Sequence, residues 1–401
     1  MTADTSHFTL RRIEVANFKR FAQAEFELRP LTLLVGLNGS GKSTLVQALL
    51  LGMRGLYARY DGFIALNQPG FALGQAEDVF TLGETQSDRI EIGLTFANGK
   101  PPWPVVFERH PDPLRLAVKS GAANALVREQ LRPSMGPEWV SYLSAERLGP
   151  RISLPVSAQG ESAVYVGAQG ELTADCLLNN LNHKVSPGRQ FPTASPDEDA
   201  LITLPKQAEQ WMTAMVPGLQ VKPIRRTEVL QSTLQFGTRE LGSEWVRPTN
   251  MGFGVSYALP IIVQGLLTAK GGILIVENPE AHLHPAGQSA MGRFLALCAA
   301  DGVQVIVETH SDHVLNGICL AVLEDKHPLR REDVLIHSFL NEPHEGKQVL
   351  AIEIDKRGGF TQNPPGFFDQ SAKDLQAILR ARRPEAQTAK KLLERAKPAE
   401  E

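Results

Sequence analysis

The segment Gly36–Ser43 constrains the fold of this 401-residue chain more than any other. It reads G-L-N-G-S-G-K-S and matches the phosphate-binding-loop pattern G-x-x-x-x-G-K-[ST]. Glycines let backbone N–H groups turn toward phosphate oxygens, and a helix that starts after the loop points its positive end at the same oxygens. The lysine reaches the β- and γ-phosphates, and the serine hydroxyl binds Mg²⁺. The residues expected to bind a nucleoside triphosphate here are Gly36, Asn38, Gly39, Ser40, Gly41, Lys42, Ser43 and Thr44.

The sequence around this loop alternates buried strands and helices. Leu31–Val35 is a short apolar run that favours a buried strand, and Lys42–Leu51 has the periodicity of a helix. Two further apolar runs, Gly272–Val276 and Val303–Val307, are typical of parallel strands covered on both faces, with a crossover helix at Gly287–Ala300 between them. This βαβ pattern predicts an α/β fold with a parallel core sheet.

Other segments predict an antiparallel part and several helices. Strand candidates at residues 90–96, 104–108 and 114–118 are separated by turns such as Asn98-Gly99, which predicts an antiparallel meander. Strands are also expected within residues 8–28, 139–143, 219–236, 334–339 and 349–354, and helices at 122–131, 171–182, 203–215 and 256–267.

Binding of a nucleoside triphosphate with Mg²⁺ also requires an acidic residue at the end of a second buried strand. This residue holds the Mg²⁺ from the side opposite the serine. The apolar run that begins at Ile273 ends in Glu277, which stands where this acid is needed. Ser43 and Glu277 are therefore the expected Mg²⁺ residues.

Five motifs in a consistent order give the chain a resemblance to a known family. Residues 277–285 read E-N-P-E-A-H-L-H-P and, after the phosphate-binding loop, resemble the Walker B box of ABC-type ATPases of the RecF, SMC and OLD groups. Residues 307–311 (V-E-T-H-S) resemble their switch-histidine segment, 251–256 (M-G-F-G-V-S) their signature loop, and 17–21 (N-F-K-R-F) their opening strand. Nearly the whole chain resembles a bacterial family of stand-alone AAA/ABC-type ATPases with a C-terminal module of unknown function.

The resemblance implies a P-loop NTPase fold of ABC type, with a mixed parallel core sheet, an antiparallel β subdomain and a helical insertion. It implies an ATPase head over residues 1–325, followed by a β-hairpin and helix module at 326–401. Within the head we expect a P-loop lobe at 1–120, an insertion lobe at 121–245 and a signature and Walker B lobe at 246–325.

The resemblance also implies a homodimer closed by ATP, or a higher oligomer. Each ATP would lie between the P-loop of one subunit and the signature loop of the other. Gly252, Gly254 and Ser256 would then contact the γ-phosphate in trans, from the positive end of a helix.

The chain departs from the family pattern directly after Glu277. The family usually has a glutamate there that takes a proton from the attacking water. This chain has Asn278, and an amide can orient a water but cannot accept its proton. Three interpretations stay open: Asn278 only positions the water, Glu280 substitutes as the base, or His310 holds the water and senses the γ-phosphate. We favour slow hydrolysis, with His310 ahead of Glu280.

Three further residues are candidates on weaker grounds. Lys19, in the opening strand, is expected near the phosphates, with a solvated lysine as the equal alternative. The glutamine-loop residue is not evident, and Gln75 is preferred over Gln68. Arg147 either faces the nucleotide or a partner, or makes a structural ion pair.

The composition excludes several other classes of protein. A net charge of -3 argues against a broad nucleic-acid coat, and three widely separated cysteines argue against a disulfide scaffold or a zinc ribbon. No signal peptide is evident, and the longest nearly apolar stretch, Ala258–Leu267, is too short to span a bilayer. We therefore expect a cytoplasmic protein with no membrane partner. Any DNA contact is expected from a local patch, such as the basic stretch 380–397, or from a partner.

These observations favour an ATP-hydrolysing switch that powers a separate effector, such as a nuclease, in anti-phage defence or another DNA-directed process. A fused Toprim nuclease is not expected, because the residues after Ser311 offer one strand-end acid pair, Glu353 and Asp355. A non-hydrolysing scaffold assembled by ATP and a RecF-like DNA-repair clamp stay open as alternatives. An SMC-like tether is rejected for lack of heptad arms, and a transporter subunit is disfavoured by the lack of an L-S-G-G-Q signature.

Overall fold

The computed structural model divides the chain by its internal contacts into two units, Met1–Thr361 and Gln362–Glu401. The structure describes residues 9–58, 62–68, 70–82, 87–97, 103–119, 139–157, 164–192, 202–238, 244–324, 329–344, 347–364, 366–371 and 373–381. The helix expected at 122–131 lies outside these residues, as does most of the basic stretch 380–397. Within the described residues, no helix has the length and apolar character that crossing a membrane requires.

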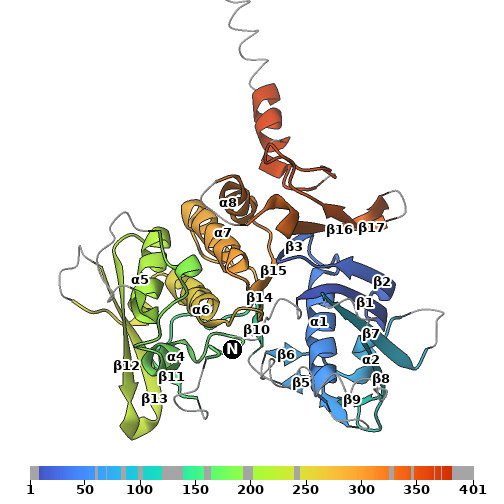
Figure 1. The fold of residues 1–401 in the computed structure, drawn as a ribbon, viewed down its shortest axis with the longest axis horizontal. Helices are drawn as coiled ribbons and strands as arrows, with labels where there is room; N and C mark the ends of the chain where they lie inside the picture. Colours follow the sequence, from blue (N-terminus) through green and yellow to red (C-terminus); the bar gives the residue numbers. More distant parts are fainter. Residues whose placement is uncertain are drawn as a thin grey trace, which may run out of the picture. The chain divides into compact units, whose positions relative to one another are not determined.

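The first unit is built on a central sheet with the strand order β10-β14-β15-β3-β16-β17 (Figure 1). Its strands are β3 (Leu31–Gly36), β10 (Val140–Leu143), β14 (Ile273–Glu277), β15 (Gln304–Glu308), β16 (Val334–His344) and β17 (Lys347–Ile352). The pairs from β10 to β16 are parallel, and β17 is antiparallel to β16. The predicted mixed, mostly parallel core sheet is thus confirmed.

The sequence of the central strands reflects their position. Every residue of β14 and β15 is buried, since helices lie on both sides of these strands. In Figure 1, α1 (Lys42–Tyr57) lies on one side of them, and α6 (Phe253–Leu267) and α7 (Pro285–Ala300) lie on the other. The parallel order brings the carboxyl ends of β3, β14 and β15 to one edge of the sheet, where the loops that follow them meet.

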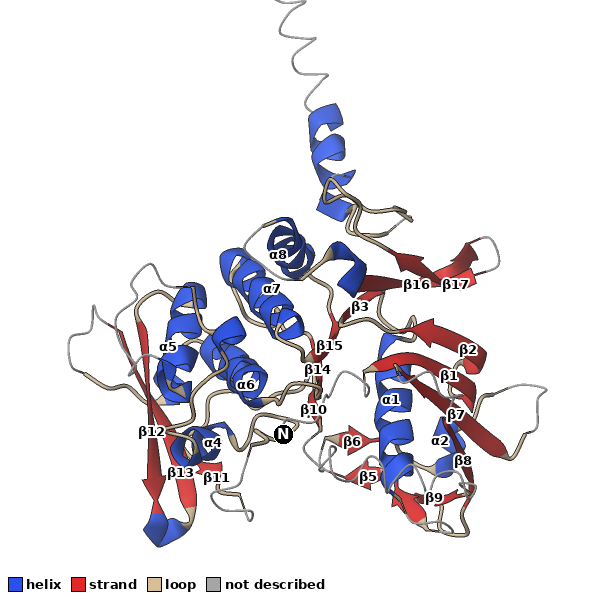
Figure 2. Ribbon diagram, viewed as in Figure 1, coloured by secondary structure: helices blue, strands red, loops and turns tan. Residues whose placement is uncertain are grey.

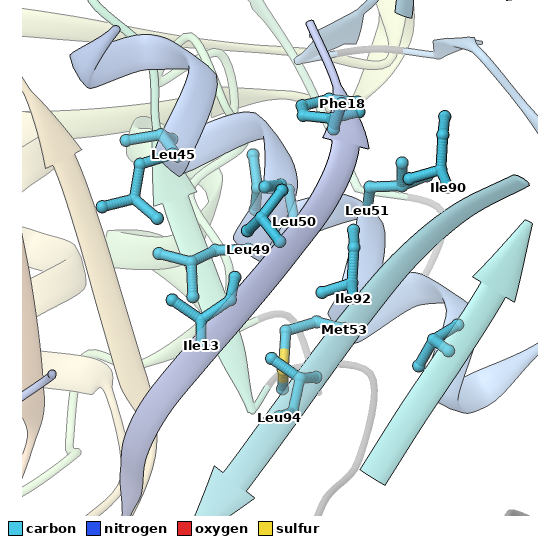
Figure 3. Packing of buried hydrophobic residues seen from close by; sticks show 14 of the residues in the cluster. Ile13, Phe18, Leu45, Leu49, Leu50, Leu51, Met53, Ile90, Ile92 and Leu94 are labelled. Carbon is cyan, nitrogen blue, oxygen red and sulfur yellow. The ribbon is translucent and has the colours of Figure 1, made fainter. Parts of the chain in front are cut away.

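An antiparallel sheet with the order β2-β1-β7-β8-β9-β4 packs against α1. Its strands are β1 (Leu10–Phe18), β2 (Phe21–Glu27), β4 (Phe63–Ala65), β7 (Arg89–Phe96), β8 (Trp103–Arg109) and β9 (Arg115–Val118). Figure 3 shows Leu49 and Met53 of α1 beside Ile13, Ile92 and Leu94 of this sheet. Truncating such a buried leucine to alanine costs about 2–5 kcal/mol, so this packing holds the helix after the phosphate-binding loop in place.

A helical and β region follows β10 and leads to α6. Figure 2 shows that it combines helices with a small separate sheet, of order β11-β13-β12. Its elements are β11 (Leu154–Pro155), α4 (Thr173–Asn179), α5 (Leu204–Met215), β12 (Leu219–Arg226) and β13 (Gln231–Thr238). The remaining elements of the first unit are β5 (Asn67–Gln68), β6 (Phe71–Ala72), α2 (Ala76–Val79) and α8 (Asp312–Leu323).

Several expected boundaries differ from the structure. The helix expected at 256–267 begins at Phe253, because Gly252 takes the N-cap position. The helix after the phosphate-binding loop continues to Tyr57, beyond the expected end. A β-hairpin was expected in a separate module that begins at residue 326. Its strand β16 instead pairs with β3 in the central sheet, and the boundary between the two units lies after Thr361.

The second unit is described over residues 362–364, 366–371 and 373–381. Its last described part, 373–381, is helical, as expected for the helix of the 326–401 module. Lys373 makes an ion pair with Asp369 across one turn.

Candidate nucleotide-binding site

The loop between β3 and α1 has the geometry of a phosphate-binding loop before any ligand is considered. Gly41 is the N-cap of α1 and has a φ of 111°, a left-handed conformation that favours glycine. A Cβ at this position would lie 2.5 Å from Cδ of Arg20, so a larger residue would also require the Arg20 side chain to shift. The Nζ of Lys42 donates to the carbonyls of Gly36 (2.9 Å) and Leu37 (2.8 Å), which holds the ammonium under the loop.

The rest of the loop is open at its tip and closed at its base. Asn38 and Gly39 are exposed, and Thr44 is half-buried in the first turn of α1. Ser40 is buried, and its Oγ has no hydrogen-bond partner within the described residues. Arg20 donates a 2.7 Å hydrogen bond to the carbonyl of Gly39. Arg20 was not among the expected site residues, although it stands beside Lys19 in the N-F-K-R-F motif.

The acidic group closest to the loop is Glu308, at the end of β15. The hydroxyl of Ser43 donates to both of its carboxylate oxygens, at 3.1 and 3.3 Å, and Lys42 Nζ lies 3.8 Å away. Burial and the neighbouring Glu277 raise the pKa of Glu308 to about 7. Burial lowers the pKa of Lys42, against the opposing effect of Glu308 and Glu280. Sequence reasoning missed Glu308, because it treated V-E-T-H-S only as a histidine motif.

Glu277, the expected metal-side acid, ends the neighbouring strand β14 and pairs in register with Glu308. The hydroxyl of Tyr142 and the backbone N–H of Ala145 each donate a 3.2 Å hydrogen bond to its carboxylate. Burial raises the pKa of Glu277, while these two donors and Arg147 oppose the shift. The side chains of Glu277, Glu308 and Ser43 together offer only oxygen donors, which fits a hard cation such as Mg²⁺.

Arg147 holds the turn that follows β14. Its guanidinium is 2% exposed and donates to the backbone carbonyls of Ser144, Tyr257, Glu277 and Asn278 over 2.6–3.1 Å. Burial lowers the pKa of Arg147 to about 10. These contacts are those of a structural residue that ties the loop after β10 and helix α6 to the turn.

Asn278 lies at the start of this turn in a left-handed conformation, with a φ of 45°. Its backbone N–H donates to the carbonyl of Glu308 over 2.8 Å. Its side-chain Oδ1 is buried and has no partner within the described residues. Asparagine adopts positive φ more readily than most residues, including glutamate, which gives a physical reason for an amide here.

Glu280 and His310 are brought together by the same turn. The Glu280 carboxylate accepts hydrogen bonds from the hydroxyl of Thr309 (2.7 Å) and the backbone N–H of His310 (2.8 Å). The His310 side chain is exposed, and partial burial together with Lys42 lowers the pKa of its imidazole. The imidazole is therefore neutral at neutral pH and can accept a hydrogen bond.

The expected signature residues lie at the start of α6, and their contacts are with the turn after β14. Gly252 is exposed, and α6 has no side-chain cap. A Cβ on Gly254 would come within 2.5 Å of the carbonyl oxygen of His282. Ser256 is half-buried in the first turn of the helix. Within the described residues, no side chain caps the N–H groups of this first turn, and the N–H of Val255 donates to the carbonyl of Gly252 over 3.2 Å.

Two expected nucleotide-binding residues have other contacts. The Nζ of Lys19 donates to Oε1 of Gln47 over 2.7 Å, along α1. Gln75 is the N-cap residue of α2, and its backbone N–H donates to Asp78. A pocket of about 310 Å³ lies between the segment 70–73 and Glu277, but Gln75 is not among its lining residues.

Two family models match the chain. The model described as an AAA ATPase domain matches residues 9–101, which contain the phosphate-binding loop. A second model matches residues 183–316, which contain the signature loop, Glu277 and His310. It is described as an AAA domain, candidate AbiEii toxin, type IV TA system.

A curated relative and two solved structures are also similar. The OLD nuclease of Thermus scotoductus is 24% identical over 348 residues, which cover 75% of this chain and 59% of that protein. The chain thus spans less than two thirds of this nuclease.

The two structures are SMC heads. One, bound to the C-winged helix domain of ScpA, has a TM-score of 0.56 at 13% identity, covering 87% of this chain and 99% of that chain. The other is from Pyrococcus furiosus, has an extended coiled coil and is bound to the C-terminal domain of ScpA. It has a TM-score of 0.52 at 12% identity, covering 92% and 99%. The two SMC heads confirm the predicted ABC-type head fold. The chain thus has the ABC-type P-loop head fold, matches two AAA ATPase-domain models over parts of its length, and is similar to SMC heads and to an OLD nuclease.

Proposed function

We propose that this chain is a Mg²⁺-dependent ATPase that closes as a homodimer around ATP and switches a separate effector. One observation carries the proposal. Lys42 and Ser43, at the start of α1, lie against Glu308, at the end of β15, and Glu308 pairs in register with Glu277. A buried lysine, a hydroxyl and two carboxylates at one sheet edge form the set of groups that a triphosphate and its cation need.

ATP binding would replace contacts that the loop makes with itself. Lys42 would leave the carbonyls of Gly36 and Leu37 for the β- and γ-phosphates. The unpartnered hydroxyl of Ser40 and the backbone N–H groups at the start of α1 are further donors. Ser43 and a carboxylate would hold Mg²⁺, which when bound neutralises charge on the phosphate oxygens.

Hydrolysis would be slow, because the groups near the attacking water orient it without a strong base. The Oδ1 of Asn278 and the neutral imidazole of His310 can each accept a hydrogen bond from the water. The Glu280 carboxylate already accepts two hydrogen bonds, from Thr309 and His310. We therefore assign Glu280 the role of positioning the segment of His310, and not the role of the base.

Dimer closure would place the open start of α6 against the γ-phosphate of the other subunit. Gly252 carries no side chain there, and the helix start has no internal cap. Two large apolar side chains next to these loops are exposed, Leu37 (58%) beside the phosphate-binding loop and Phe253 (55%) at the start of α6. Burying both in a head-to-tail contact would favour closure.

Our proposal for the effector and the pathway depends on the proteins to which this chain is similar. The type IV TA system in one family description and the OLD nuclease as a relative support a role in defence or in a DNA-directed process. We place the ATPase in the cytoplasm and expect the effector, such as a nuclease, to be a separate protein.

The closure is tested at Gly252. A Cβ at this position meets no atom within 4 Å, so Gly252→Asp fits the monomer and caps α6. In the dimer its charge would face the γ-phosphate and repel it. We expect sedimentation velocity with ATP and Mg²⁺ to show dimers of the wild type and of the uncharged control Gly252→Ser, and monomers of Gly252→Asp. Dimers of Gly252→Asp equal to the wild type would contradict the contact in trans.

The amide at Asn278 favours one second candidate, a scaffold that ATP assembles without hydrolysis. Both candidates predict an ATP-dependent dimer, so phosphate release separates them. Release above background by the dimer, with or without DNA, supports the ATPase. A stable dimer with no release under either condition supports the scaffold.

A further inference from the structure

Three carboxylates lie near the phosphate-binding loop at this edge of the sheet, and the structure gives each a different set of partners. Glu280 accepts from Thr309 and His310, on the side of the turns. Glu277 accepts from Tyr142 and Ala145, on the side of β10. Glu308 accepts from Ser43 and lies next to Lys42, both in the phosphate-binding loop.

The partners of Glu308 are the two groups that ATP binding would redirect. Lys42 would pair with the β- and γ-phosphates, and Ser43 would turn its oxygen toward the cation. Glu308 is 6% exposed and pairs in register with Glu277, so losing the ammonium would leave two buried carboxylates side by side. A buried carboxylate without a compensating positive charge is strongly unfavourable.

The sheet order explains why Glu308 holds this position. β15 lies between β14 and β3, so the side chain at its carboxyl end lies nearer to Ser43 than the end of β14 does. The donors to Glu277 also orient its carboxylate toward β10 and the loop that Arg147 holds.

We propose that Glu308 is the carboxylate that, together with Ser43, holds the divalent cation, and that Glu277 holds the loop after β10. This inference rests on the proposed function, since the cation is the one that accompanies ATP. It assigns Glu308 a binding role and changes the role expected for Glu277.

The test compares cation binding in isosteric variants of the full chain. Mn²⁺ would be titrated by electron paramagnetic resonance into protein saturated with the non-hydrolysable ATP analogue AMP-PNP. We expect Glu308→Gln to weaken Mn²⁺ binding by about tenfold or more. Glu277→Gln should lose clearly less affinity than Glu308→Gln, and the exposed control Glu228→Gln should stay close to the wild type. Glu308→Asp should recover part of the affinity, because it keeps a carboxylate.

Nucleotide binding without a cation is the second readout. In EDTA, a fluorescent ATP analogue should bind Glu308→Gln as tightly as the wild type or more tightly, because a negative charge near the phosphates is removed. This result would also show that Glu308→Gln is folded.

Two results would overturn the inference. One is Mn²⁺ affinity of Glu308→Gln equal to the wild type, and the other is a larger loss in Glu277→Gln than in Glu308→Gln. Failure of the wild type to bind the ATP analogue would instead refute the proposed function.

Discussion

The carboxylate of Glu280 accepts a 2.8 Å hydrogen bond from the backbone N–H of His310. A second bond of 2.7 Å, from the hydroxyl of Thr309, uses the other carboxylate oxygen. The turn after β14 and the segment after β15 are thereby tied together at the edge of the sheet where ATP is proposed to bind. Glu280 therefore fixes the backbone from which the His310 imidazole extends.

Replacing Glu280 with alanine should slow phosphate release by about tenfold or more, because His310 would no longer be fixed beside the water. ATP affinity should change less, since within the described residues Glu280 makes no hydrogen bond or ion pair with the phosphate-binding loop and acts on Lys42 only through its charge. Steady-state phosphate release and equilibrium ATP binding would measure the two effects, with the exposed Glu228→Ala as control. An unchanged release rate in Glu280→Ala would show that the link to His310 is not used.

Replacing Arg147 with methionine should destabilise the protein by about 3 kcal/mol or more, because several buried carbonyls would lose their donor. Arg147→Lys keeps the charge but loses the planar fork, so it should recover only part of this stability. Urea unfolding would measure both. Arg330→Met is the matched control, since the side chain of Arg330 is 74% exposed. A loss in Arg147→Met no larger than in the control would contradict the structural role of Arg147.

The stability of the ligand-free protein should fall as the pH rises through the range in which Glu308 titrates. The pKa of Glu308 is raised from 4.5 to about 7 by burial and by Glu277. Between these values the folded state holds a proton that the unfolded chain has lost, so the free energy of unfolding decreases with pH, by at most about 3 kcal/mol. Glu308→Gln removes this titration and should be more stable than the wild type at pH 8. Urea unfolding from pH 5 to 8 would show a flatter curve for Glu308→Gln, whereas parallel curves would contradict the expectation.

Introducing a carboxylate at position 278 should speed hydrolysis if the water lies there. Asn278→Asp matches the size of the amide and tolerates the φ of 45°, whereas Asn278→Glu has the longer reach of the family residue. We expect Asn278→Glu to raise the rate of phosphate release by about tenfold or more, at a cost of about 1 kcal/mol in stability. Single-turnover phosphate release would measure the rate. Comparing Asn278→Asp with Asn278→Glu would show whether the longer side chain is needed to reach the water. A rate equal to or below that of the wild type in Asn278→Glu would place the water elsewhere.

Local sequence patterns predicted the parts of the fold that depend on local chemistry. The loop Gly36–Ser43, the buried runs that end at Glu277 and Glu308, and the meander at 90–118 all appear as elements near the expected bounds. In these segments the periodicity of burial determines the structure. The start of α6 was missed because Gly252 serves as the N-cap, which the expected start at Ser256 did not allow for.

Contacts between distant segments could not be read from the sequence. Nothing local indicates that β15 lies between β14 and β3, which is why Glu308 was overlooked and Glu277 was preferred. The pairing of β16 with β3 is of the same kind, since the partners are some 300 residues apart. Gln75 was preferred without a clear glutamine-loop motif, and in the structure it forms a local capping box with Asp78 at the start of α2.

The central claim, that the loop Gly36–Ser43 binds ATP, is tested most directly by equilibrium ATP binding to Lys42→Ala. The surface variant Lys206→Ala is the control, because its ammonium is exposed and pairs with Glu209. The account predicts that the wild type and Lys206→Ala bind ATP in the presence of Mg²⁺, and that Lys42→Ala, although folded, has lost most of this affinity. Binding of ATP to Lys42→Ala as tight as to the wild type would contradict the claim.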